Sequence, residues 1–324
     1  MLTAKKYSMR EQSVAIISCL LFMMAACAIT CIGQQPTDPL AQERALVNAG
    51  KVAESESALL QFIKTNPTSA DAHFLLGYVL FREHKAKESL AEFTAGAKFR
   101  RPRPDELKVV ASDYVMLGDF GDADKWYSEV VIESPNDAEA NYLLGRTKFN
   151  ENDFPAAIES FNRALALRPK FVEAENNIGL AWRELNDLAK ARAAYQTAIE
   201  WQGDAPHDAQ PYLNLGTLLA DQNEVEKALP LLAKAAVLSP ANPTIHEELS
   251  HVYTLQRNLP KAQSELEAAV ALAPNISSLH FKLGQIYRQE GMRDLAREQF
   301  DICSKLSGAH SSEKTPNPIS IQNP

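Results

Sequence analysis

Apolar and polar residues follow a helical rhythm along the chain, interrupted by short polar breaks. In residues 157–167, the apolar side chains of Ala157, Phe161 and Ala164 recur at intervals of three to four, the spacing of a helix with one buried face. The break over residues 150–153 is wholly polar (Asn-Glu-Asn-Asp), and Asn or Asp there can accept hydrogen bonds from the first N–H groups of the next helix. The pattern predicts pairs of amphipathic helices joined by short polar turns.

The predicted helix pairs repeat along the chain. A column of small residues marks the first helix of each pair, and a column of alanines marks the second. The small residues are Gly77, Ala111, Gly145, Gly179, Gly216, Ser250 and Gly284. Successive members are 34 residues apart, except for a step of 37 between Gly179 and Gly216. The alanine column has the same longer step between Ala191 and Ala228, so three extra residues are expected in the linker around residues 202–208.

The small residues predict where helices cross. Two helices approach closely only where one of them contributes a residue with little side chain. We expect Gly145 and Ala157 to meet within one pair, while large side chains such as Phe161, Tyr195 and Phe300 fill the space beside the crossings of their own units. The repeat therefore predicts a stack of helix pairs in which each pair buries its apolar face against the next.

These columns resemble those of the tetratricopeptide repeat family. The match is clear at Leu144, Gly145, Phe161 and Pro169, and the resemblance covers about residues 38–306. Seven clear units are predicted to begin near Ala70, Pro104, Ala138, Val172, Ala209, Pro243 and Ser277, after a degenerate unit over residues 38–69. One match would be weak evidence, whereas seven in register are specific to such an array.

The resemblance implies an all-α fold, an α-solenoid in which tetratricopeptide-type helix pairs form a right-handed superhelix with an extended inner groove. The array divides into the degenerate unit over 38–69 and the clearer units over 70–306. Residues 307–324 are rich in Ser, Pro and Asn and contain few apolar side chains, so a disordered C-terminal tail is expected there.

Residues 1–33 have the composition of an export signal. The basic residues Lys5, Lys6 and Arg10 precede an uncharged, mostly apolar run over residues 14–32, and polar residues follow. The chain is therefore expected to be exported, as a periplasmic or secreted protein.

Three outcomes are open for this segment. Cleavage after Gly33 would give a mature chain that begins at Gln34. Met24-Ala25-Ala26-Cys27 resembles a bacterial lipoprotein box, which would make Cys27 a lipidated membrane tether. The apolar run also approaches the ~20 residues that span a bilayer, so an uncleaved signal anchor is the third outcome.

Composition argues against several classes of function. The chain has 33 Lys and Arg against 41 Asp and Glu, a net charge of −8, which disfavours nucleic acid as a partner. Beyond residue 31 it holds a single cysteine, Cys303, so neither a disulfide framework nor a cysteine zinc cage is expected in the array. His246 and His251 are five apart and do not share a helix face. With no glycine-rich phosphate loop or nucleophile elbow, we expect no enzyme activity, no metal, no cofactor and no small-molecule substrate.

The resemblance implies a protein-binding scaffold that holds peptide segments or partner helices in its concave groove. Projection of the first helices onto that groove places Lys108 and Ser112 there, together with six candidate partner-binding residues. These six are Tyr142, Arg146, Phe149, Asn177, Arg183 and Asn214. A primary amide can donate to and accept from a peptide backbone, and a guanidinium can hold a carboxylate. The two-lysine, asparagine-rich clamp that some family members use for a C-terminal carboxylate is not present at matching positions.

Each of these assignments has an alternative. The asparagines are common at exposed helix positions, and the two arginines can pair with Glu175 or Glu184 instead. The aromatic stripe Phe74, Tyr78 and Phe81 is more typical of packing against a neighbouring helix, here in the degenerate first unit, than of a binding surface. For the whole protein, the alternative is a structural subunit of a cell-envelope or secretion assembly that docks through its convex face or its C-terminal end.

Overall fold

The computed structural model describes residues 38–310, without the side chains of residues 309 and 310, and this part of the chain is all-α, with sixteen helices and no strand. The predicted signal segment over 1–33, the lipidation candidate Cys27 and most of the predicted disordered tail lie outside the described residues. Within 38–310, none of the helices has both the length and the apolar character that a membrane span requires.

The helices form eight consecutive pairs. They are α2 (Ala41–Asn48) with α3 (Val52–Thr65), α4 (Ala70–Arg82) with α5 (Ala86–Ala97), α6 (Pro104–Met116) with α7 (Phe120–Glu133), α8 (Ala138–Asn150) with α9 (Phe154–Leu167), α10 (Val172–Glu184) with α11 (Leu188–Gln202), α12 (Gln210–Asp221) with α13 (Val225–Leu238), α14 (Pro243–Leu255) with α15 (Leu259–Leu272), and α16 (Ser277–Gln289) with α17 (Arg293–His310). Six of the seven clear units start at the predicted residue, and α12 starts one residue after Ala209. The last helix continues to His310, past the expected end of the array at residue 306.

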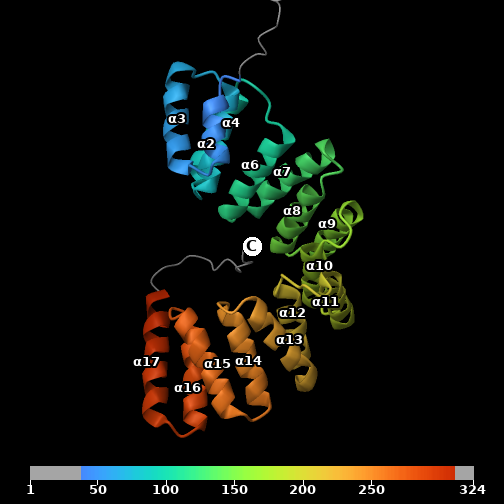
Figure 1. Ribbon diagram of the computed structural model, residues 1–324, viewed down its shortest axis with the longest axis vertical. Coiled ribbons are helices and arrows are strands. Elements are labelled where there is room, and N and C mark those ends of the chain that lie inside the picture. Colours follow the sequence, from blue (N-terminus) through green and yellow to red (C-terminus); the bar gives the residue numbers. More distant parts are fainter. Residues whose placement is uncertain (1–37, 311–324) are drawn as a thin grey trace, which may run out of the picture.

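The pairs stack into an open arc (Figure 1). First helices of neighbouring pairs contact each other directly, as α4 does with α6, α8 with α10, α10 with α12 and α12 with α14. Because elements on the inside of a curve lie closer together than those on the outside, this row of first helices forms the concave face. The solenoid predicted from the repeat is confirmed.

The predicted crossings between helices of one pair are also confirmed. A Cβ atom built on Gly145 would lie 2.6 Å from the Cδ1 atom of Phe161, and one built on Gly284 would lie 2.7 Å from Cε1 of Phe300. Ala157 is fully buried beside the first of these contacts. The ring of the second helix therefore fills the space that the missing side chain leaves, as close packing of protein interiors requires.

Polar residues start many of the second helices, as the sequence predicted. Asp119, Asp153 and Asp187 each accept a hydrogen bond from a backbone N–H in the first turn of α7, α9 and α11. The turns before these helices contain a residue with positive φ, which is Asn152 (φ 63°) before α9 and Asn186 (φ 59°) before α11. Asn tolerates this left-handed conformation better than most residues do, so the turn residue and the cap residue together set the hairpin.

The linker that contains the three-residue insertion is held in place by the side chain of Gln202. The Oε1 atom of Gln202, the last residue of α11, accepts hydrogen bonds from the backbone N–H groups of His207 (3.0 Å) and Asp208 (2.8 Å). Its Nε2 atom donates to the carbonyl oxygen of Asp208 (3.1 Å). Gly203 follows with φ 60° and ends the helix. Gln202 thus ties the longer linker to the end of α11, and α12 rejoins the repeat.

One carboxyl group is buried between the first two clear units. Asp113 of α6 is 0% exposed, and its Oδ2 atom lies 2.6 Å from the Oγ atom of Ser89 on α5. The Ser89 hydroxyl also lies 2.8 Å from the carbonyl oxygen of Gly77. A hydroxyl has one proton, so Ser89 can donate to the carbonyl and accept from the carboxyl only when Asp113 is protonated. Burial raises the pKa of Asp113 to about 7, in agreement with this arrangement.

Candidate functional site

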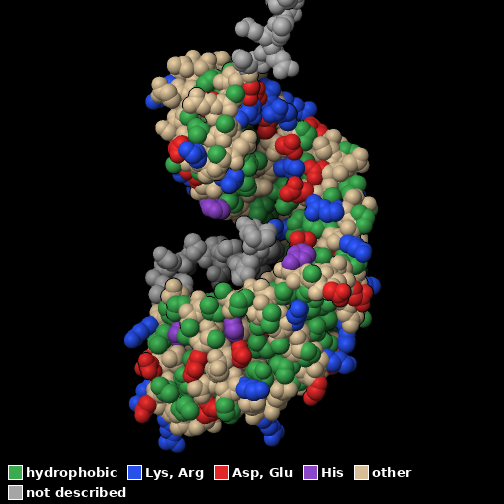
Figure 2. All heavy atoms as spheres, in the orientation of Figure 1, with side chains coloured by type: hydrophobic (Ala, Val, Ile, Leu, Met, Phe, Trp, Pro, Cys, Tyr) green, Lys and Arg blue, Asp and Glu red, His purple; other side chains and the backbone are tan. Residues whose placement is uncertain are grey.

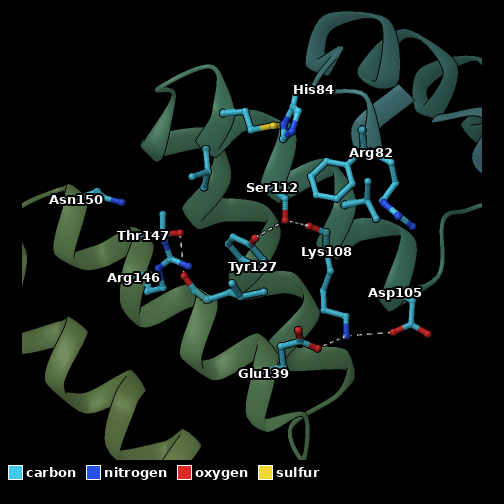
Figure 3. Close-up of a pocket in the computed structure, with 15 residues that line it drawn as sticks. Arg82, His84, Asp105, Lys108, Ser112, Tyr127, Glu139, Arg146, Thr147 and Asn150 are labelled. Carbon is cyan, nitrogen blue, oxygen red and sulfur yellow. Dashed lines mark hydrogen bonds and ion pairs between the residues drawn. The ribbon is translucent and has the colours of Figure 1, made fainter. Parts of the chain in front are cut away.

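A pocket of about 630 Å³ opens on the concave face between α4, α6 and α8 (Figure 3). Its apolar lining includes Val109, Val115 and Leu143, together with the ring of Tyr127 from α7. Its polar lining includes Arg82, His84, Asp105, Lys108, Glu139 and Arg146. This size and this mixture of an apolar interior with a few polar groups are typical of ligand sites.

One of the residues that line the pocket has an unusually small side chain for its place in the repeat. Ser112 stands 34 residues from Tyr78 in one direction and from Arg146 in the other, so the three occupy the same place in consecutive units. Ser112 is much smaller than either neighbour. Its Oγ atom donates to the carbonyl oxygen of Lys108 (2.8 Å) and lies 2.7 Å from the hydroxyl of Tyr127. These bonds hold the serine against its own helix and leave the space above it open.

The lysine at one end of the pocket is fully occupied by acidic partners. The Nζ atom of Lys108 lies 2.9 Å from Asp137, 3.2 Å from Asp105 and 3.7 Å from Glu139. Burial disfavours the charged form, but hydrogen bonds to Asp137 and Asp105 outweigh that effect and raise the pKa of Lys108. Lys108 is therefore a structural ion-pair partner that ties α6 to the start of α8.

The two arginines of the pocket have no carboxylate partner among the described residues. Arg82 donates a long hydrogen bond of 3.4 Å to the hydroxyl of Tyr78. Arg146 lies over the ring of Tyr142, 5.9 Å from its centroid, and its Nε atom is buried without a hydrogen-bond partner. An unpaired polar atom of this kind is costly to bury, which makes Arg146 the group in the pocket that is most in need of an acceptor.

The structure uses the predicted amides to join helices. The Nδ2 atom of Asn177 on α10 donates to the hydroxyl of Tyr142 on α8 (3.0 Å), and Asn177 is only 9% exposed. The Nδ2 atom of Asn214 on α12 donates to Oδ1 of Asn176 on α10 (2.8 Å). These bonds connect consecutive first helices along the concave face and take up part of the hydrogen-bonding capacity that the sequence analysis assigned to a partner.

The other two predicted residues lie away from the pocket. Phe149 packs edge-on against Phe154 of the following helix, with ring centroids 5.3 Å apart. Arg183 pairs with Asp221 at 3.8 Å, so its ion-pair partner is neither Glu175 nor Glu184. Of the six candidates, Arg146 alone lines the pocket.

The aromatic stripe on α4 is divided between two environments. Phe74 is 2% exposed, and its ring stacks on that of Phe93 with centroids 5.7 Å apart. It is therefore a packing residue, but its ring partner lies on α5 of the same pair and not on the degenerate first unit. Phe81 lines the pocket instead. Sequence reasoning missed Arg82, Val109 and Leu143 as pocket residues. The available signal was Ser112, a small polar residue between the much larger Tyr78 and Arg146 of the same column.

His246 and His73 have structural partners. The Nδ1 atom of His246 lies 2.8 Å from Glu265 and its Nε2 atom lies 3.0 Å from the carbonyl oxygen of Pro240. His73 is held in the same way by Glu92 and by the carbonyl oxygen of Pro67. Within residues 38–310, no three His, Cys, Asp or Glu side chains are gathered as metal ligands would be.

The fold and the concave face define the class of protein as an α-solenoid of helix pairs with an open inner surface. A model of the tetratricopeptide repeat matches residues 40–105, 111–170 and 142–205. The chain belongs to the tetratricopeptide repeat family.

Two known proteins are similar in sequence to part of this chain. Anaphase-promoting complex subunit 3 of Schizosaccharomyces pombe is 22% identical over 205 residues, which cover 63% of this chain and 30% of that protein. Human protein O-mannosyl-transferase TMTC1 is 26% identical over 195 residues, covering 59% of this chain and 22% of that protein. The chain thus spans less than a third of the length of either relative.

A solved tetratricopeptide repeat protein from Parabacteroides merdae ATCC 43184 superposes with a TM-score of 0.62 at 18% identity, covering 76% of this chain and 96% of that one. At this identity the likeness shows the fold alone. Tetratricopeptide repeat proteins are generally non-catalytic, although one relative is named a transferase, and the fold is that of a scaffold for protein–protein interaction.

Proposed function

We propose that this protein is a non-catalytic scaffold that holds a segment of another protein along its concave face. The observation that carries the proposal is the pocket between α4, α6 and α8, which combines an apolar interior with guanidinium groups that have no carboxylate partner among the described residues. An extended segment would run across the row of first helices and place one side chain in this pocket. The pocket then supplies the burial that anchors the segment.

The mixed charge of the surface supports a protein as the partner. On the face that Figure 2 shows, acidic and basic side chains are interspersed, and no continuous basic surface runs along the arc. With 41 acidic against 33 basic residues, the chain also repels phosphate backbones.

The proposed site of action is outside the cytoplasm, with or without an N-terminal membrane tether, and this part rests only on the sequence of residues 1–33.

The test is to fill the pocket. In Ser112→Phe, the new ring occupies the space above the serine, and we expect capture of the partner by crosslinking and pull-down from the host's cell envelope to fall about tenfold or more. Ile132→Ser is the control, because Ile132 is 79% exposed on the second helix α7, away from the pocket. Thermal melts of both variants would verify that the solenoid is intact.

The outcomes separate this proposal from a structural role. If Ser112→Phe captures the same proteins as the parent chain, the pocket is not the anchor. If, in addition, Ile132→Ser or removal of residues 277–306 releases the complex, the protein docks through its convex face or its C-terminal end, as a structural subunit would.

A further inference from the structure

Resting on the proposed function, we propose that this pocket selects segments in which a bulky apolar residue lies close to an aspartate or glutamate. The apolar side chain would fill the hollow above Ser112, and the neighbouring carboxylate would bind the guanidinium of Arg146. The partner is thus defined by chemistry, as a protein segment with an apolar anchor and one adjacent negative charge.

The apolar half of the site follows from its walls. Val109, Val115 and Leu143 line the pocket from two consecutive first helices, and Tyr127 closes it from α7. The Tyr127 hydroxyl is bonded to Ser112, so its hydrogen-bonding capacity is partly used inside the protein. Such a surface favours an aliphatic or aromatic side chain. Its binding releases water from the apolar walls, and no hydrogen bond of these walls is lost in the exchange.

The charged half follows from what the pocket cations already bind. Lys108 is paired with Asp105, Asp137 and Glu139, so its positive charge is already compensated within the protein. Arg146 has no ion-pair partner among residues 38–310, although acidic residues outnumber basic ones in the chain. Its Nε atom is out of contact with solvent and unpartnered. A carboxylate can bind the two terminal Nη atoms of a guanidinium through two parallel hydrogen bonds, which would give these atoms of Arg146 the acceptors that they lack.

The placement of charges also sets where the carboxylate can lie. In Figure 3, Arg146 and Lys108 lie on opposite sides of Ser112 and Tyr127. Asp105 and Glu139 surround Lys108 and would repel an acidic group at that end. Arg82, the other guanidinium without a carboxylate partner, already donates to the hydroxyl of Tyr78 and has no buried unpartnered atom. The negative charge of a bound segment is therefore favoured at the Arg146 end, while its apolar neighbour lies over Ser112.

The site is specific to one place in the array. In the units after Arg146, the same column holds Leu180, Thr217, His251 and Gln285, none of which is a fixed cation. The combination of a small residue followed by an arginine in consecutive units occurs only at Ser112 and Arg146 within this column. Selectivity for an acidic group is thus expected from this pocket and not from the groove as a whole.

The experiment is a selection with a random dodecapeptide library displayed on phage, panned against the full chain and, separately, against Ser112→Phe, Arg146→Met and Thr217→Phe. Thr217→Phe is the matched control, because it adds the same ring in the same column two units beyond Arg146. The strongest peptide from the parent chain is then synthesised with its acidic residue and with the corresponding amide, and binding of both is measured by fluorescence anisotropy.

We expect the parent chain and Thr217→Phe to enrich peptides with Asp or Glu within two residues of Leu, Ile, Met or Phe, and Ser112→Phe to enrich none of them. The acidic peptide should bind the parent chain about tenfold more tightly than its amide form, since charge-assisted hydrogen bonds are the stronger ones. In Arg146→Met the two forms should bind within about twofold of each other, while Arg146→Lys should keep part of the preference.

Each other result overturns the inference in a distinguishable way. Enriched apolar peptides that are lost on Ser112→Phe but show no acidic residue would leave the proposed function standing and remove the role of Arg146. Acidic peptides that bind Arg146→Met as selectively as the parent chain would do the same. Peptides that persist on Ser112→Phe, or no enrichment at all, would overturn both the inference and the pocket as the anchor. Circular dichroism of every variant identifies any loss of fold.

Discussion

At the scale of single residues, the buried carboxyl of Asp113 links the folding of this protein to pH. An unfolded aspartate ionises near its ordinary pKa of 3.8, whereas burial raises the pKa of folded Asp113 to about 7. The folded state therefore holds a proton that the unfolded state has released. As pH rises from about 4 to about 7, the folded state loses stability relative to the unfolded state, and above 7 the loss is complete.

We predict that Asp113→Asn is more stable than the parent chain at pH 8, by up to about 4 kcal/mol, and that the advantage shrinks as the pH is lowered towards 4. The amide cannot ionise, and its N–H can still donate to the Ser89 oxygen. Urea unfolding at several pH values measures the difference, with Asp294→Asn as the control because that side chain is 98% exposed. A variant that is less stable at pH 8 would show that Asp113 is ionised in the fold.

His246 has the opposite dependence. Burial lowers its pKa, but hydrogen bonds to Glu265 and to the carbonyl of Pro240 outweigh that effect, so the net pKa is raised above 6.5. Both ring nitrogens face acceptors, which suits the doubly protonated ring. A raised pKa gives stability that is fully present below 6.5 and is lost as pH rises through the folded value.

We predict that Glu265→Gln reduces this pH dependence. Glutamine is uncharged, so it stabilises a protonated ring less than a carboxylate does, and the protein already contains such a pair, since Nδ1 of His280 lies 2.7 Å from the amide oxygen Oε1 of Gln299. Chemical shifts of the His246 ring followed by NMR from pH 5 to 9 should show a lower pKa in Glu265→Gln than in the parent chain. An unchanged titration would mean that Glu265 does not hold the proton on His246.

At the scale of helices, the fold depends on how closely the two members of each pair cross. We predict that Gly145→Ala costs about 1–3 kcal/mol, because the new methyl group would lie 2.6 Å from the ring of Phe161 and the ring is fully buried. Gly121→Ala on α7 is the control. Its methyl group would meet nothing closer than an oxygen of Asp119 at 3.9 Å, so helix propensity should make it neutral or slightly stabilising. Equal thermal melts for the two variants would contradict this account of the crossing.

Helix positions were predictable to within a residue at most unit starts, and the reason is local. A repeat of nearly fixed length, a polar turn and a small residue at each crossing are all properties of a few neighbouring residues, and they agree with one another in the seven clear units. Pro230 lies inside α13, which nevertheless extends from Val225 to Leu238.

At the scale of the whole molecule, the arc places the first helices in a continuous inner row, and contacts between units decide what that row presents. Asn177 was expected to face a partner, but its amide bonds to Tyr142, 35 residues earlier in the chain. Arg146 was expected to hold a carboxylate, and it does lie in a pocket. Column position assigns both residues to the same face, so the column alone could not tell them apart.

The sequence by itself determined the helix pairs, their number in the array, the insertion and the family, because each of these depends on spacing along the chain. Only the tertiary structure decided which side chains form hydrogen bonds between neighbouring units and which remain available to a ligand. That outcome depends on the distances between residues a full unit apart, where Ser112 leaves room beside Arg146 and Asn177 meets Tyr142. Such distances are set by the curvature of the packed stack, which no single unit contains.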